Sequence, residues 1–178
     1  YSLRFQGEDV LNSSRLGIIT SENDLSSGFT VDEVSFNAVS NTWTQPWGEQ
    51  KEILDEHREI KLFMTHDTGI KMNLVFRLFD QGLGFRYEWP AQDSLQDFVI
   101  MDELSEFNLS EEATAWWIRA YIPNRSEHLY LETPVTEVDT AQTPITFRTR
   151  KGTHIAIHEA ALTDYAAMSL ANNGRGSL

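Results

Sequence analysis

The sequence contains no cysteine, which excludes disulfide bonds, thiolate nucleophiles and thiolate metal sites within its 178 residues. No run approaches the roughly 18 apolar residues needed to span a bilayer. Basic residues are also scarce: 14 lysines and arginines stand against 27 acidic residues, for a formal net charge of -13. Nucleic acid and anionic membrane surfaces repel such a chain, so we expect neither as a partner.

Helical periodicity is hard to find. Residues 49–60 carry many charges without a clean apolar stripe, and residues 160–170 combine helix-forming residues with β-rich surroundings. Short runs of alternating apolar and polar residues dominate instead, broken by Gly, Pro, Asn and Asp. These runs cover residues 3–5, 31–39, 60–64, 72–79, 83–89, 117–121, 145–149 and 155–157. Asp80-Gln81-Gly82 predicts a tight turn within a hairpin. Many short strands with turn signals predict an all-β sandwich.

Two tryptophan-rich motifs are candidates for carbohydrate binding. Trp43 and Trp47 bracket a proline, and Glu49 follows closely. Aromatic planes suit the C–H faces of sugars, and carboxylates accept hydrogen bonds from sugar hydroxyls. Trp116 and Trp117 are adjacent, so on a strand one is expected in the core and the other exposed or in a cleft. The alternative for both motifs is packing, either in the core or in a loop that closes one end of the sandwich.

The segment from Ile157 to Tyr165 carries a carboxylate into a run of small residues, which let a ligand approach closely. His158, Glu159 and Asp164 are candidate hydrolytic or metal-binding groups, as is Tyr165. The segment lacks a second histidine at helical spacing, so it is not a two-histidine metalloprotease motif. No Gly-x-Ser-x-Gly elbow supports a Ser-His-Asp triad. The alternative is a structural role for all of these groups.

Four motifs, in order along the chain, resemble glycoside hydrolase family 97, the α-glucosidase and α-galactosidase family. They are Trp47-Gly48-Glu49, the residues 80–90, the residues 102–107 and, above all, the residues 157–165. The resemblance implies that residues 1–178 are part of an N-terminal β-sandwich domain, a galactose-mutarotase-like supersandwich that is incomplete at both ends. A catalytic (β/α)₈ barrel and a small β domain would follow. No catalytic residue is then expected in this chain, which alone should be inactive.

The resemblance also implies a calcium ion in the active-site cleft, held mostly by glutamates of the barrel and by one glutamate of this chain, Glu159. Calcium takes six to eight oxygen ligands, which suits a carboxylate. We assign Trp47, Glu49, Trp117 and Asp164 to the binding of an α-linked gluco- or galacto-oligosaccharide. The family suggests a periplasmic setting. An incomplete sandwich leaves strand edges unpaired, so we also expect homodimers through sheet edges.

Three hypotheses therefore remain: an accessory domain of a calcium-dependent exo-acting α-glycosidase, a stand-alone carbohydrate-binding module that uses Trp47, Trp116 or Trp117, and a purely structural sandwich. The reading frame downstream of Leu178 separates the first from the others. The choice between glucoside and galactoside, and between inverting and retaining chemistry, depends on barrel residues.

Overall fold

The structure is a computed structural model that describes residues 1–123, 127–174 and 177–178. Within these residues it contains β-strands and one short 3₁₀ segment, η1 (Val135–Glu137), so the predicted all-β fold is confirmed. None of the helical structure in this part of the chain is long and apolar enough to cross a bilayer. The chain forms two compact units, with Gly17–Glu103 inserted between Tyr1–Leu16 and Leu104–Leu178.

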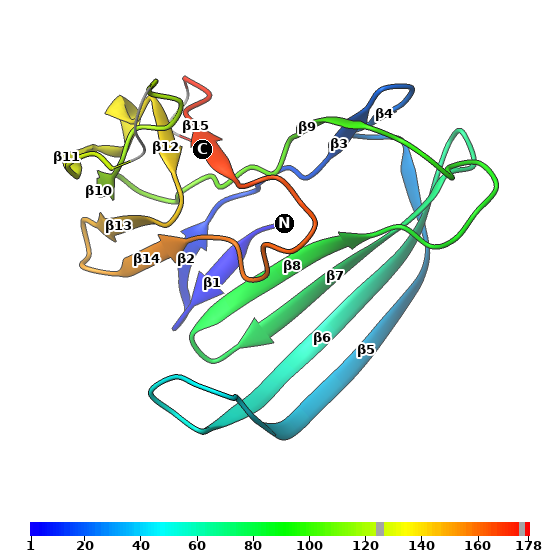
Figure 1. Cartoon of the computed structure of the whole chain (residues 1–178), viewed down its shortest axis with the longest axis horizontal. Helices are drawn as coiled ribbons and strands as arrows, with labels where there is room; N and C mark the ends of the chain where they lie inside the picture. Colours follow the sequence, from blue (N-terminus) through cyan, green and yellow to red (C-terminus); the bar gives the residue numbers. More distant parts are fainter. Residues whose placement is uncertain (124–126, 175–176) are drawn as a thin grey trace. The chain divides into compact units, whose positions relative to one another are not determined.

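The inserted unit is built on a four-stranded antiparallel sheet with the order β5-β6-β7-β8 (Figure 1). These strands are β5 (Phe29–Thr44), β6 (Glu52–His66), β7 (Lys71–Phe79) and β8 (Gly82–Glu88). A smaller sheet has the order β4-β3-β9. Its strands are β3 (Ile18–Thr20), β4 (Asp24–Leu25) and β9 (Ile100–Glu103). The predicted turn is confirmed, because β7 ends at Phe79 and β8 begins at Gly82.

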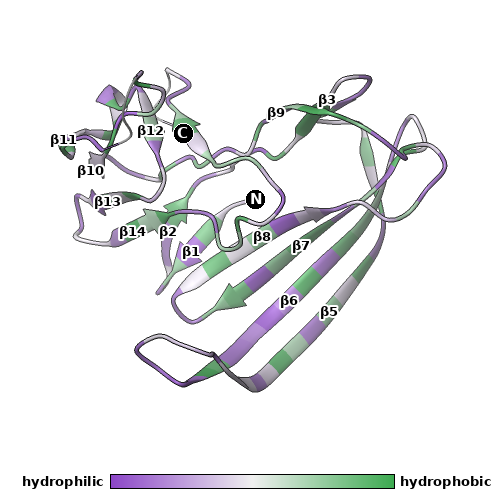
Figure 2. Cartoon of the chain, viewed as in Figure 1, coloured by the Kyte–Doolittle hydropathy of each residue, from purple (hydrophilic) through white to green (hydrophobic). Residues whose placement is uncertain are grey.

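Alternation accounts for the long hairpin of β5 and β6. Hydrophobic and hydrophilic residues alternate along both strands (Figure 2), as a sheet with two unlike faces requires. The pairing runs from Phe29 opposite His66 to Thr44 opposite Glu52, with one irregularity between Val31 and Glu33. The charged stretch at 52–60 is therefore strand. Most of β5 is exposed, which lets this hairpin carry charges along its length.

The other unit holds a four-stranded sheet and two strand pairs. The sheet has the order β11-β10-β13-β14, and the pairs are β1-β2 and β12-β15. Their bounds are β1 (Leu3–Phe5), β2 (Glu8–Leu11), β10 (Ala113–Trp117), β11 (Leu131–Pro134), β12 (Thr140–Gln142), β13 (Ile145–Thr149), β14 (His154–Ile157) and β15 (Ser169–Ala171). Alternate residues of β10 and β13 are buried, so Ala115, Trp117, Ile145 and Phe147 form the centre of its core.

One strand prediction is corrected, and the segment at 160–170, whose pattern left helix and strand both open, is assigned. The run at 117–121 was expected to form a strand, but the strand is β10 and Trp117 is its last residue. The run at 160–170 contributes only the start of β15, and residues 158–168 form an irregular loop. Helix-forming residues do not produce a helix there because the segment lacks an apolar stripe to bury.

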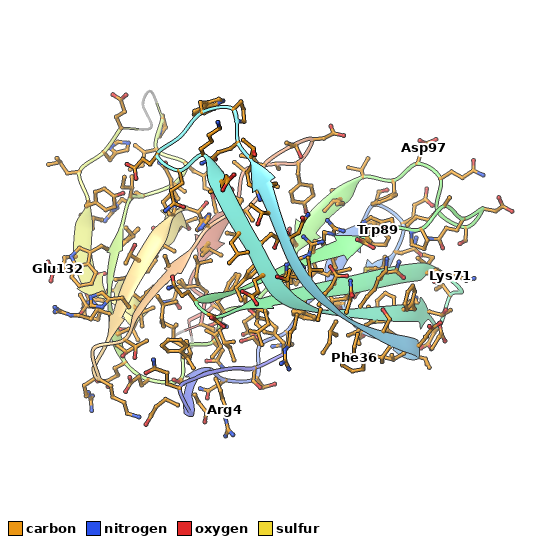
Figure 3. The ribbon with its side chains drawn as sticks, turned by 90° about the horizontal axis from the view of Figure 1, so that it is seen from below. Arg4, Phe36, Lys71, Trp89, Asp97 and Glu132 are labelled. Carbon is orange, nitrogen blue, oxygen red and sulfur yellow. The ribbon has the colours of Figure 1, made fainter. Side chains whose placement is uncertain are left out.

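Strand β5 forms one edge of its sheet and presents Phe36, which is 75% exposed and labelled in Figure 3. An edge strand offers unpaired N–H and C=O groups to a further strand. The expected homodimer through such edges stays a prediction.

Candidate functional site

A pocket of about 330 Å³ opens in the unit formed by Tyr1–Leu16 and Leu104–Leu178. Its lining includes polar groups from Gln142, Thr143 and Glu159 and apolar groups from Leu162 and Met168. Tyr121, which is 82% exposed, adds an aromatic ring to its rim. A wall of this mixed character suits a ligand that presents both hydroxyl groups and C–H surface.

Three segments that are distant in sequence build this pocket. Strand β14 ends at Ile157 and delivers Glu159 two residues later. The pairing of β12 with β15 places Gln142 opposite Ser169, so Thr143 and Met168 flank this pair. The segment around Ala120 is attached to β12 by backbone hydrogen bonds, Ala120 N to Thr140 O at 2.9 Å and Gln142 N to Ile118 O at 2.8 Å.

The Glu159 carboxylate is half-buried in the pocket wall and held on both oxygens. The Thr143 hydroxyl donates to Oε2 at 2.6 Å, and the Met168 backbone N–H donates to Oε1 at 2.5 Å. Burial acts to raise the pKa of Glu159, but these hydrogen bonds, together with one from the Glu159 backbone and the nearby His158, outweigh burial, and the pKa is lowered from its ordinary value. The group is therefore a carboxylate anion at neutral pH.

The chemistry of this donor suits calcium as one ligand among several. A carboxylate offers about four lone-pair directions, more than the hydrogen bonds from Thr143 and Met168 occupy. Hard oxygen donors are the ligands that calcium prefers, and the ion takes six to eight of them. No group of three or more His, Cys, Asp or Glu side chains that could hold a metal occurs among the described residues. This part of the chain can therefore supply Glu159 but not a complete site.

The neighbours of Glu159 do not converge on the pocket in the same way. His158 is exposed, and its Nδ1 lies 2.7 Å from the backbone oxygen of Glu159, which makes that nitrogen the donor. Asp164 is exposed, has a φ of 58°, and is absent from the pocket lining. Aspartate tolerates this left-handed conformation better than most residues, so its place in the loop has a local structural explanation. Its assignment to substrate stays a prediction.

Trp47 and Glu49 lie in the other unit, at the end of the β5–β6 hairpin. Trp47 is 85% exposed and Glu49 is also exposed. The connection is closed by hydrogen bonds from Gln45, whose backbone N–H donates to Lys51 O at 3.0 Å and whose Nε2 donates to Gln50 O at 2.5 Å. Gly48 has a φ of 130°, a conformation that favours glycine. The indole ring of Trp47 is thus presented to solvent by a closed turn.

Trp117 is a core residue, and its assignment to substrate is wrong. Its side chain is 1% exposed, and its Nε1–H donates to Thr133 Oγ1 at 3.1 Å. Strand alternation turns Trp117 inward and leaves its neighbour Trp116 half-buried on the other face. The guanidinium carbon of Arg148 lies 5.4 Å from the Trp116 ring centroid, so that ring has a cationic neighbour on its own sheet.

Sequence reasoning missed Thr143 and the Met168 N–H, the two groups that hold Glu159. They lie 16 residues before and 9 residues after the glutamate. No sequence motif connects Thr143 or Met168 with Glu159. The three residues meet only because β12 pairs with β15. A threonine directly before a proline was the one local signal, and it indicates a turn rather than a site.

Comparison with known proteins gives a consistent result. The family model described as Glycosyl-hydrolase 97 N-terminal matches residues 1–178. A probable retaining alpha-galactosidase of Streptomyces bingchenggensis (strain BCW-1) is 30% identical over 167 residues, which cover 92% of this chain and 25% of that protein.

The solved structures agree in fold. A Glycoside Hydrolase Family 97 enzyme from Pseudoalteromonas sp. strain K8, solved as a variant in complex with panose, is 39% identical and superposes with a TM-score of 0.94 over 99% of this chain. The same enzyme was solved in complex with acarbose. A beta-arabinopyranosidase shares the fold at 20% identity, with a TM-score of 0.79 over 87% of this chain. This chain spans 28% of the Pseudoalteromonas enzyme.

Proposed function

Because the chain belongs to the N-terminal domain family of glycoside hydrolase family 97, whose model matches residues 1–178, we propose that it is the N-terminal part of a calcium-dependent, exo-acting α-glycosidase. The observation that carries this proposal is the half-buried Glu159 carboxylate, held on both oxygens in the wall of a pocket. Family membership supports a glycosidase as the whole protein, and the geometry supports a ligand role for this carboxylate.

In this proposal Glu159 supplies one oxygen ligand, and a catalytic barrel elsewhere in the protein supplies the others. Bound calcium would orient substrate hydroxyls and adjust the charge around neighbouring carboxylates. Within this chain, Thr143 and Met168 hold the Glu159 side chain, and Tyr121 and Leu162 give the pocket apolar surface. The two carboxyl groups that cleave a glycosidic bond would come from the barrel.

The substrate we propose is an α-linked gluco- or galacto-oligosaccharide. One relative was solved with panose and acarbose, and the other is named as a probable α-galactosidase, so the two point to different sugars. Trp47 offers the most exposed tryptophan ring in the residues whose exposure is described, and Glu49 lies beside it in sequence. We assign this pair to sugar contact, by stacking on a C–H face and by accepting a hydroxyl hydrogen bond. A periplasmic location is part of the proposal.

The test is the substitution Glu159→Gln in the full-length enzyme that carries this domain. The change keeps the shape of the side chain and removes its charge, so we expect weaker calcium binding and lower turnover of p-nitrophenyl α-glycosides. Calcium affinity is measured by titration calorimetry and turnover by released nitrophenol. Glu112→Gln, which also removes one charge but at an exposed position, is the matched control.

Unchanged calcium affinity and unchanged turnover in the Glu159→Gln enzyme would show that Glu159 is not a ligand. Thermal unfolding in the presence of a chelator completes the test. If the calcium-free variant unfolds at a much lower temperature than the calcium-free parent enzyme, the carboxylate serves the fold instead.

A further inference from the structure

Glu159 does not hold its own conformation. A glutamate side chain has several rotatable bonds, and ordering it costs conformational entropy. Here the carboxylate accepts one hydrogen bond on each oxygen, from Thr143 Oγ1 at 2.6 Å and from the Met168 N–H at 2.5 Å. One donor is a side chain on the segment after β12, and the other belongs to the backbone directly before β15. The plane and direction of the carboxylate are thus set before any ligand arrives.

We propose that Thr143 is a positioning residue that fixes the Glu159 carboxylate for calcium binding. This inference rests on the proposed function, because it assumes that Glu159 is a calcium ligand. Groups that hydrogen-bond a metal ligand determine its orientation and contribute to affinity, since the ligand then loses less freedom when the ion binds. The Thr143 hydroxyl occupies only one of the two lone pairs of Oε2.

The alternative is that Thr143 only fastens the 158–168 loop. Its Oγ1 also lies 3.3 Å from the Met168 backbone oxygen. A hydroxyl has one proton, however, and it goes to the nearer and charged acceptor, which is Glu159 Oε2 at 2.6 Å. The two roles predict different measurements. A loop fastener affects the stability of the calcium-free protein, whereas a positioning residue affects calcium affinity.

The experiment compares Thr143→Val, Thr143→Ser and Thr146→Val in the full-length enzyme. Valine matches the shape of threonine without its hydroxyl, and serine restores the hydroxyl. Thr146 is a half-buried threonine on β13 that does not line the pocket, so Thr146→Val repeats the chemical change away from the site. Calcium affinity is measured by titration calorimetry, and the melting temperature is measured with a chelator present.

We expect Thr143→Val to weaken calcium binding by about tenfold or more, the usual effect of removing a group that orients a metal ligand. Thr143→Ser should recover most of the affinity, and Thr146→Val should leave it unchanged. The melting temperature of calcium-free Thr143→Val should fall by less than about 3 °C.

Glu159→Gln, measured in parallel, distinguishes the positioning role of Thr143 from the ligand role of Glu159. If Glu159→Gln weakens calcium binding and Thr143→Val does not, the positioning role is wrong and the proposed function survives. If neither substitution changes the affinity, the proposed function itself fails. A large fall in the calcium-free melting temperature of Thr143→Val, with no recovery of calcium affinity by serine, would also overturn the positioning role.

Discussion

The tryptophan side chains of this chain occupy opposite environments. Trp117 fills the core of its unit at 1% exposure and donates a hydrogen bond to Thr133, whereas Trp47 is 85% exposed at the end of a hairpin. A buried indole stabilises the fold through its large apolar area and its satisfied N–H group. An exposed indole contributes little to stability and is free to contact a ligand. The two residues should therefore respond to the same substitution in opposite ways.

Replacing Trp117 with Ala should lower the free energy of unfolding by about 3–5 kcal/mol, because the change opens a large cavity in the core. Trp47→Ala should change it by less than about 0.5 kcal/mol, as is usual for an exposed position. Urea unfolding of each variant, followed by tryptophan fluorescence, gives both values. In the full-length enzyme we expect Trp47→Ala to weaken oligosaccharide binding, and an unchanged sugar affinity would contradict its assignment to substrate.

The candidate site was only partly predictable at this scale. The chain has 27 acidic residues, and no local pattern distinguishes Glu159 from the others. Only the resemblance of residues 157–165 to a family motif made Glu159 a candidate. Alternation correctly predicted that Trp116 and Trp117 face opposite ways, but it does not tell which face is the core. Thr143 was out of reach because a non-local strand pairing, β12 with β15, brings it to Glu159.

At the scale of elements, charged side chains cross the large sheet. Glu88 on β8 accepts hydrogen bonds from Lys61 Nζ at 2.6 Å and from Arg86 Nε at 2.8 Å, and Arg77 on β7 donates to Glu59 on β6 at 2.8 Å. The Glu88 side chain is only 24% exposed. Burial acts to raise the pKa of Glu88, yet its bonds to Lys61 and Arg86 prevail and the pKa lies below its ordinary value. Its ionised form therefore stabilises the sheet.

Replacing Glu88 with Gln should lower the free energy of unfolding by about 1 kcal/mol near pH 7. Because the folded-state pKa is lowered, this contribution is present above the ordinary pKa of 4.5 and disappears as the pH falls through the folded value. Urea unfolding at about pH 7 and about pH 3 should show the difference between parent and variant shrinking in acid. A difference that stays constant would exclude the charge as its source.

A matched control for Glu88 is Glu112→Gln, which removes an equally charged partner of an arginine. Both partners of the Glu112–Arg150 ion pair are exposed, the Glu112 side chain to 80% and the Arg150 side chain to 71%. Exposed ion pairs contribute little because water screens them and their side chains are mobile. We expect the variant to unfold within about 0.5 kcal/mol of the parent at both pH values.

The elements themselves were predictable where the pattern is local. The β7–β8 hairpin follows from alternation and from Asp80-Gln81-Gly82, and β13 matches its predicted bounds, Ile145–Thr149. The full length of β6 was not predictable, because charges from Asp55 to Glu59 obscure the alternation on an exposed hairpin. The loop at 158–168 was not predictable either, since helix-forming residues in β-rich surroundings left helix and strand both open and the segment has no apolar face to bury.

At the scale of the whole molecule, the chain spans 25% of the length of the Streptomyces protein and 28% of the length of the Pseudoalteromonas enzyme. It supplies one candidate calcium ligand, and no group of three metal-binding side chains occurs in its described residues. The proposed function therefore depends on groups that this chain does not provide. That dependence can be tested by comparing the chain alone with the full-length enzyme.

We predict that the 178-residue chain alone binds calcium weakly or not at all and does not cleave p-nitrophenyl α-glucoside or α-galactoside. A ligand that binds the folded state raises the melting temperature in proportion to the logarithm of its concentration over Kd. About 1 mM calcium should therefore leave the melting temperature of the isolated chain unchanged, because one carboxylate cannot replace the six to eight oxygens that the ion requires. The full-length enzyme should melt at a lower temperature, and lose turnover, once a chelator removes its calcium.

Calorimetric binding by the isolated chain with a Kd below about 10 µM, which is the range of complete sensor sites, would show that a full calcium site lies within these 178 residues. Turnover by the purified chain would place the catalytic carboxyl groups there as well.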